Sequence, residues 1–368
     1  MCVPNRNTRR FSSASAILGL LLLAPLGGST LVSCQGSGGP ASTASISEPR
    51  RELQTQIDDA DELFGQQEFD DARQRYEAIY LAAEARGYDG EATEAAAQCS
   101  ASLSMLNRLD DAELWLERAE EKAEPSAERS WSRVLLARGM QRLKNRDLLT
   151  ARRTFIELYN FCFLNSLTPR AIQAATLASE SSQGQEQLDW SMRAIQAAST
   201  TGNVQWQAPL WSSHAWLLND RGRAEEALEA FKKARDLTGR ADISRLGRIQ
   251  ADWAYGHGLR VSGQLEEARD LLEETNAIAH SIYIGKPSAR AAKSLGQVLW
   301  EIGEIDAMEG KKERAREHLL AARSKMLEAG PAEGAPALVE ELDARLEALD
   351  APVPVRRFPP DFGNKKKQ

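Results

Sequence analysis

Pairs of carboxylates recur along the chain, and two acidic side chains at a fixed spacing are common machinery for acid–base catalysis. They are Asp70-Asp71, Asp110-Asp111, Glu225-Glu226 and Glu266-Glu267. Each pair directly precedes an alanine in a similar stretch of sequence. There it is expected in the first turn of a helix, where negative charge contributes about 0.3–1 kcal/mol through the helix dipole. Because the feature repeats from unit to unit, we interpret the pairs as structural.

The histidines and the one short glycine motif form no recognised catalytic or metal-binding arrangement. The sequence contains neither a histidine pair at i,i+4 nor an HExxH motif. The segment IGKPS at 284–288 lacks the upstream glycine of a phosphate loop, because residue 280 is His. The four histidines are His214, His257, His280 and His318.

The cysteines also argue against metal or disulfide chemistry. Cys2, Cys34, Cys99 and Cys162 include no CxxC pair and no evenly spaced framework. We expect Cys99 and Cys162 to be buried core residues. The sequence therefore predicts no enzyme, no catalytic residue, no metal and no cofactor.

The amino terminus has the order of an export signal. Arg6, Arg9 and Arg10 precede an apolar run at 14–26, which is shorter than the roughly 20 residues that span a bilayer. The run then breaks into glycine and serine before Cys34.

The residues before that cysteine, Leu31-Val32-Ser33, complete a sequence that resembles the lipobox of bacterial lipoproteins. The resemblance implies signal recognition at these residues, cleavage before Cys34 and lipid attachment to its sulfur and amino group. An ordinary signal peptide with an incidental cysteine is the alternative. On the first interpretation, residues 1–33 are the signal peptide and residues 34–51, rich in Gly, Ser, Ala and Thr, are a flexible linker.

Lipidation would set the location of the mature chain. A lipoprotein cysteine carries at least two acyl chains, and each buried methylene contributes about 0.8 kcal/mol to membrane binding. We expect attachment to a membrane of the bacterial cell envelope, on its periplasmic or extracellular face. Gln35, in place of an aspartate after the cysteine, favours the outer membrane over the inner one in a Gram-negative cell.

From residue 52 a twelve-residue pattern recurs six times around a central alanine. The alanines are spaced by 40, 39, 76, 41 and 47 residues, and 76 is about twice 38, which predicts a degenerate unit around 171–198. Small residues stand twelve positions before several of them, and a larger residue stands four positions after. Internal repeats of this period predict a solenoid. The six alanines are Ala72, Ala112, Ala151, Ala227, Ala268 and Ala315.

The pattern resembles the tetratricopeptide repeat (TPR), which has a small residue at position 8, Ala at 20, an aromatic or Leu at 24 and Ala at 27. The clearest unit, 208–237, has Trp211 at position 4, Leu218 at 11 and Gly222 at 15. The units are nearer 40 residues than the consensus 34, and the first has Ile79 where alanine is expected.

The resemblance implies an all-α, right-handed superhelical solenoid of about seven TPR-like helix pairs over residues 52–350. An amphipathic stretch at 337–349 is the expected C-terminal capping helix. Residues 351–368, rich in proline and lysine, are expected to be a disordered tail.

In this repeat family, positions 2, 5, 9, 12 and 13 of each first helix face the concave surface. Exposed tryptophans beside a cation and amides would make a peptide-binding surface, since Trp and Arg are enriched among binding hot spots. The alternative is that long helices bury these tryptophans between repeats. The predicted binding residues are Trp216, Asn219, Trp253, His257, Arg260 and Trp300, and further concave positions are Gln250, Gln297, Glu304, Arg133, Met140 and Lys144.

The predicted function is a membrane-anchored scaffold or adaptor of the bacterial cell envelope that binds a partner protein or peptide in the concave groove. The alternative is an accessory or sensor subunit whose groove holds a small molecule or glycan. The net charge of −7 argues against a dedicated nucleic-acid binder.

Overall fold

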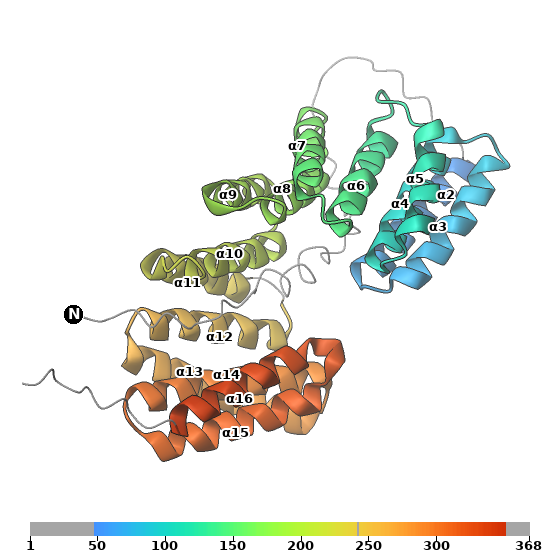
Figure 1. Ribbon diagram of the computed structural model, residues 1–368. Coiled ribbons are helices and arrows are strands. Elements are labelled where there is room, and N and C mark those ends of the chain that lie inside the picture. The colour runs from blue at the N-terminus through green and yellow to red at the C-terminus, as the bar shows by residue number, and fades with distance from the viewer. Residues whose placement is uncertain (1–47, 241–242, 351–368) are drawn as a thin grey trace, which may run out of the picture. The chain divides into compact units, whose positions relative to one another are not determined.

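The computed structural model describes residues 48–240 and 243–350, which form fifteen α-helices, one short 3-10 helix and no strand (Figure 1). The chain divides into two compact units between Ser244 and Arg245, and each is described by itself. This part of the chain is a TPR-like helical solenoid of seven helix pairs and a capping helix, as the repeat pattern predicted.

The first unit contains five antiparallel helix pairs, stacked in chain order (Figure 1). First helices pack on the first helices of neighbouring pairs, as α4 does on α2 and α6. The pairs are α2 (Glu48–Gly65) with α3 (Phe69–Glu84), α4 (Asp89–Met105) with α5 (Leu109–Glu121), α6 (Glu128–Lys144) with α7 (Leu148–Leu164), α8 (Thr168–Glu180) with α9 (Gly184–Thr200), and α10 (Val204–Asn219) with α11 (Ala224–Arg240).

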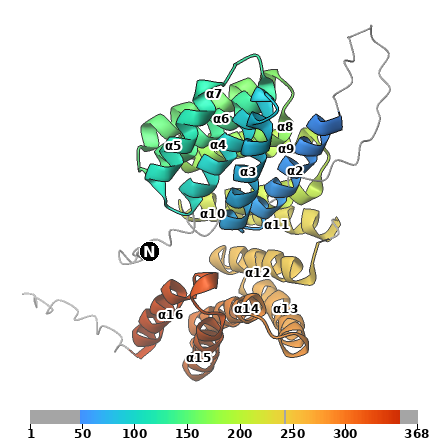
Figure 2. The same ribbon diagram turned by 90° about the vertical axis from the view of Figure 1, so that its right-hand side faces the viewer.

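The second unit contains two further pairs and the cap. The pairs are α12 (Arg245–Val261) with α13 (Leu265–Gly285) and α14 (Ala289–Met308) with α15 (Lys312–Ala329), followed by η1 (Pro331–Glu333) and α16 (Ala335–Asp350). Helix α16 lies against α15 (Figure 2), where Leu342 is fully buried and Leu338 and Leu346 pack on the same cluster. The expected capping helix is therefore present.

The small residues of the repeat are found where paired helices meet. A Cβ added to Gly139 would lie 2.4 Å from the ring of Phe155, and one added to Gly256 would lie 2.7 Å from Leu272. Both large residues stand four positions after a repeat alanine, as the pattern predicted. All six repeat alanines are at most 1% exposed. The repeat thus encodes close approach on one helix and a filling side chain on the other.

The turn inside most pairs passes through the left-handed region five residues before the repeat alanine. Gly222 and Gly263 adopt φ of +72° and +82° there. The Gly222 turn is closed by the amide of Arg223, which donates to the Leu218 carbonyl oxygen at 3.0 Å. Gln67, Asn107 and Arg146 adopt the same conformation without being glycine, which is why the turn was visible from the sequence in only some units.

The degenerate unit is a helix pair, α8 with α9, as its spacing predicted. Ser191, Ile195 and Ala198 are buried at the spacing that alanine, large residue and alanine have in the other units. The Ser191 hydroxyl and His214 Nδ1 are hydrogen-bonded at 3.0 Å, linking α9 to α10. Serine in place of the alanine explains why the register was hidden in the sequence.

The ends of the chain lie outside the described residues, and so do Leu31, Val32, Ser33 and Cys34. Helix α2 begins at Glu48, four residues before the predicted start of the repeats. Among the residues described, none of the helices is both long enough and apolar enough to cross a membrane.

Candidate binding faces of the first helices

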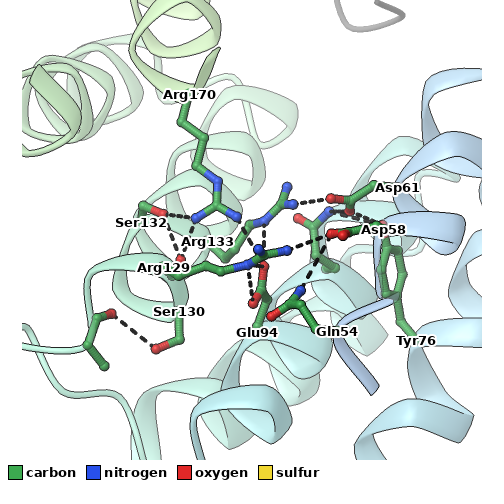
Figure 3. A network of polar contacts seen from close by, with 12 residues as sticks. Gln54, Asp58, Asp61, Tyr76, Glu94, Arg129, Ser130, Ser132, Arg133 and Arg170 are labelled. Carbon is green, nitrogen blue, oxygen red and sulfur yellow. Dashed lines mark hydrogen bonds and ion pairs between the residues drawn. The ribbon is translucent and has the colours of Figure 1, made fainter. Parts of the chain in front are cut away.

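A network of charged side chains joins the first helices of four successive pairs in the first unit (Figure 3). We call it the first-unit network. Arginines from α6 and α8 meet carboxylates from α2 and α4, and Tyr76 of α3 closes one side. Its charged members are Asp58, Asp61, Glu94, Arg129, Arg133 and Arg170.

Glu94 is the centre of this network because it accepts hydrogen bonds from all three arginines. Arg129 Nε donates to it at 2.9 Å, Arg170 Nη2 at 3.0 Å and Arg133 Nε at 3.3 Å. Arg133 also contacts Asp61, which accepts a further hydrogen bond from Gln98 Nε2 at 2.8 Å.

The network is charge-balanced and mostly buried. Arg133 is 3% exposed and Glu94 is 2% exposed, whereas Arg129 keeps 43% of its side chain in solvent. Burial raises the pKa of Glu94, but Arg170, Arg133 and Arg129 outweigh that effect and lower the net pKa below its ordinary value. Burial and the like charge of Arg133 lower the pKa of Arg170 to about 10. Because three arginines are matched by three carboxylates, the charges of the network are neutralised by one another.

The burial of this network differs from what the repeat positions implied for α6. Arg133 and Met140 occupy positions that should face a concave surface, yet both are at most 3% exposed. Arg133 is held by Asp61 and Glu94, partners that the sequence analysis did not identify. The network is therefore interpreted as a structural link between repeats rather than as a ligand site.

A second, smaller arrangement lies on α12 and α14 of the second unit, and we call it the second-unit cluster. Glu301 is its centre. Arg260 Nε donates to Glu301 Oε2 at 2.6 Å, and His257 Nδ1 lies 2.9 Å from Oε1. Burial opposes ionisation of Glu301, but Arg260 and His257 overcome it and lower its pKa to about 2. Glu301 therefore stays ionised across the physiological range.

At least one helical turn from Glu301, amide side chains of α12 and α14 are hydrogen-bonded to each other. Gln250 Nε2 donates to Gln297 Oε1 at 2.9 Å and to the Ser294 hydroxyl oxygen at 3.0 Å. Gln250 and Gln297 both occupy position 2 of their repeats. This alignment shows that equivalent positions of α12 and α14 face each other.

The tryptophans predicted to bind a partner are all partly buried. Trp216 meets Phe231 edge to face, with ring centroids 5.0 Å apart, inside the α10–α11 pair. Trp300 packs against the cluster that contains Leu319 and Met326. Trp253 lies on α12, and its side chain retains some exposure.

The structure brings some of the predicted binding residues together. His257 and Arg260 of α12 both contact Glu301 of α14. Because these two helices pack together, Trp253 of α12 and Trp300 of α14 belong to the same helix layer. Trp216 and Asn219 belong to the first unit. Glu301 was missed because it lies at repeat position 6, which the family pattern does not assign to the concave face. The binding role of all six residues stays a prediction.

One carboxyl on α8 has an unusual environment. Glu180 Oε2 is buried and accepts no hydrogen bond from any residue that the structure describes. Burial raises the pKa of Glu180 to about 8, against a smaller opposing effect of Lys144. The carboxyl is mostly protonated at neutral pH, so it leaves the charge of Lys144 largely uncompensated.

The cysteines of the described chain are placed as expected. Cys99 and Cys162 are free and buried. Burial raises the pKa of the Cys162 thiol to about 11 and raises that of Cys99 as well. Thiols held in the neutral form are poor nucleophiles. Within residues 48–240 and 243–350, no group of three or more His, Cys, Asp or Glu side chains is arranged to hold a metal ion.

Comparisons with known proteins agree on the fold. No protein-family model matches the chain, and no curated protein matches its sequence. Among solved structures, the apo form of RapI is 12% identical with a TM-score of 0.63, covering 80% of this chain and 82% of RapI. A STAND-type signal transduction ATPase with a tetratricopeptide repeat sensor, from Pyrococcus horikoshii, is 14% identical with a TM-score of 0.59. It covers 82% of this chain, which spans 45% of that ATPase. These likenesses show a TPR-like fold.

Proposed function

We propose that the chain is a protein-interaction scaffold or adaptor whose partner, a protein or peptide, binds the first-helix face of α12 and α14. The observation that carries the proposal is the composition of this face. It combines two partly exposed tryptophans with an ion-paired arginine and one pair of hydrogen-bonded amides. Trp and Arg dominate binding hot spots, and amides match the hydrogen-bonding groups of a peptide backbone.

The same geometry favours binding over catalysis. A general acid or base works best when its pKa is near the operating pH. Glu301 has a pKa of about 2 and is held by Arg260 and His257, so it serves to position those side chains rather than to transfer a proton. We therefore propose that the chain is not an enzyme.

We also propose that lipid on Cys34 anchors the scaffold to a membrane of the bacterial cell envelope. The support is the sequence Leu31-Val32-Ser33-Cys34 behind a basic and apolar leader. Replacing Cys34 with alanine should abolish labelling by a radioactive fatty acid and block normal processing. A variant that stays membrane-bound and is cut as efficiently as wild type would exclude this anchor.

The partner is sought by affinity capture of the full chain from detergent-solubilised envelope. Wild type should retain a stoichiometric protein, and Trp253→Ala should lose it while melting at a near-normal temperature. Truncating a hot-spot tryptophan costs about 2 kcal/mol or more in affinity, which is about thirtyfold in dissociation constant.

Trp300 needs a gentler variant because it also packs against Leu319 and Met326. Trp300→Phe keeps much of that packing and removes the indole. Trp115→Ala, on a second helix in the first unit, is the control for general loss of an aromatic side chain. If Trp253→Ala unfolds most of the protein and the fraction that stays folded binds normally, Trp253 is a core packing residue and this face is not the binding site. Absence of any protein partner would favour a small molecule or glycan.

A further inference from the structure

The turn between α6 and α7 departs from the repeat in a way that no other turn in the described chain does. Helix α7 is the only second helix there with no acid in its first turn. Leu149 and Thr150 occupy the two positions that hold an acid pair in four other units. An acid pair favours the helix dipole, so its replacement by leucine and threonine has no local structural benefit.

Apolar side chains are exposed at this turn. Leu148 is 40% exposed and Leu149 is 51% exposed at the start of α7. The helix begins here because Asp147 caps it, accepting a hydrogen bond from the Thr150 amide at 3.2 Å. The cap therefore satisfies the backbone, and neither leucine is needed to do so.

Basic residues flank the two leucines in the sequence. Residues 142–153 contain five basic side chains and one carboxylate, Asp147, in a protein whose overall charge is −7. Arg152 pairs with Glu186 at 2.7 Å. The others form no ion pair with any residue of the described chain, and Glu180, the carboxyl whose pKa Lys144 lowers, is mostly protonated. These unpaired cations are Arg142, Lys144, Arg146 and Arg153.

We propose that this basic and apolar turn, residues 142–153, docks on an anionic lipid bilayer. Basic side chains near such a surface each strengthen partitioning about fivefold. Exposed leucines beside such basic residues enter the headgroup region and bury apolar area there. Two exposed leucines and four cations without an ion pair lie within one short segment of an otherwise acidic chain, and this combination matches a surface that is negatively charged and has an apolar interior. This surface is distinct from the proposed partner-binding face and requires no lipid on Cys34.

The experiment measures cosedimentation of the full chain with lipid vesicles, using a Cys34→Ser background so that no lipid is attached. Vesicles of phosphatidylcholine alone are compared with vesicles that also contain phosphatidylglycerol. The unmodified turn should favour the anionic vesicles, and added salt should weaken binding because it screens the charges. Arg142→Gln with Arg146→Gln should lower partitioning about 25-fold. Leu148→Ser with Leu149→Ser should lower it several-fold at unchanged charge.

The matched control is Arg75→Gln with Lys232→Gln, which removes the same charge from exposed positions on α3 and α11. It should change partitioning less than twofold. Equal losses in the control and the turn variant would show only a net-charge effect and overturn the proposal. The proposal is equally wrong if the turn variants bind vesicles normally but lose an acidic protein in affinity capture. Capture of a partner through Trp253 is unaffected by either result.

Discussion

The first-unit network and the second-unit cluster both join first helices of successive pairs, but they use charge differently. The first-unit network spans four pairs and matches three arginines with three carboxylates around Glu94. The second-unit cluster joins two pairs through one carboxylate, Glu301, and has two tryptophans on the same helices. A saturated network is suited to holding repeats in register. A small cluster beside partly exposed indoles is suited to binding.

The two arrangements differ in the roles assigned to them within one fold: a structural link in the first unit, and the proposed partner-binding face in the second. Buried ion pairs contribute little net stability against a hydrophobic alternative, but removing one partner is costly. Such pairs link α2, α4, α6 and α8 in the first unit, where loss of one member is expected to be costly. Helices α12 and α14 carry Trp253, Arg260 and Trp300, which are of the residue types enriched in binding hot spots.

The largest effect is expected from removing Arg133, which tests whether the first-unit network is structural. Arg133→Ala should destabilise the first unit by about 3–5 kcal/mol, because Asp61 would stay buried without its arginine and Glu94 would lose one of its three. Thermal denaturation followed by circular dichroism measures the loss. Arg75→Ala, on the exposed surface of α3, should change stability by no more than about 0.5 kcal/mol. A comparable melting temperature for both variants would mean that the network is not structural.

A repeat alanine gives the next largest effect. Ala227 is 1% exposed, and the equivalent alanines lie against the partner helix, where Ser100 donates to the Ala112 carbonyl oxygen at 2.7 Å. Ala227→Leu should overpack this contact and cost about 1–3 kcal/mol. An unchanged melting temperature would show that Ala227 does not lie at the helix–helix contact.

Glycine substitutions compare the packing of the two units directly. A Cβ on Gly139 would lie 2.4 Å from the Phe155 ring, whereas one on Gly303 would lie 3.0 Å from Leu319. Alanine gains about 1 kcal/mol in helix propensity at either site. Gly139→Ala should therefore be net destabilising by about 1–2 kcal/mol, since an enclosed ring resists displacement. Gly303→Ala should be close to neutral, and the reverse order in urea denaturation would contradict this packing difference.

The pH dependence of Glu301 is the smallest expected effect. Its pKa is about 2 in the folded chain against an ordinary 4.5, so its contribution is complete above about pH 5 and is lost as pH falls toward 2. Between pH 7 and pH 4 this carboxyl should account for a loss of about 1 kcal/mol. Glu301→Gln should show a correspondingly shallower decline in urea denaturation. The same slope in both chains would mean that Glu301 does not titrate as described.

The repeat pattern predicted most of the architecture because it acts locally. Small residues, filling residues and turns recur at spacings that only paired helices satisfy, so seven pairs and a cap were visible without coordinates. Asn107 and Arg146 stand in left-handed turns where the pattern expects glycine, and Ser191 stands in place of the repeat alanine, so residue type alone could not reveal these positions. Position 2 of the first helix was correctly aligned between Gln250 and Gln297.

What the sequence by itself determined is the class of fold, the placement of each acid pair in the first turn of a helix and the burial of Cys99 and Cys162. Each follows from a residue's own position in a repeat. Only the tertiary structure decided which charges are neutralised, because the arginines that contact Glu94 lie on other helices and are separated from it by 35 or more residues in the sequence. It also decided that Arg133 is enclosed while Leu149 is exposed. Both outcomes depend on which neighbours pack beside a helix, and a repeat pattern specifies spacing but not the identity of those neighbours.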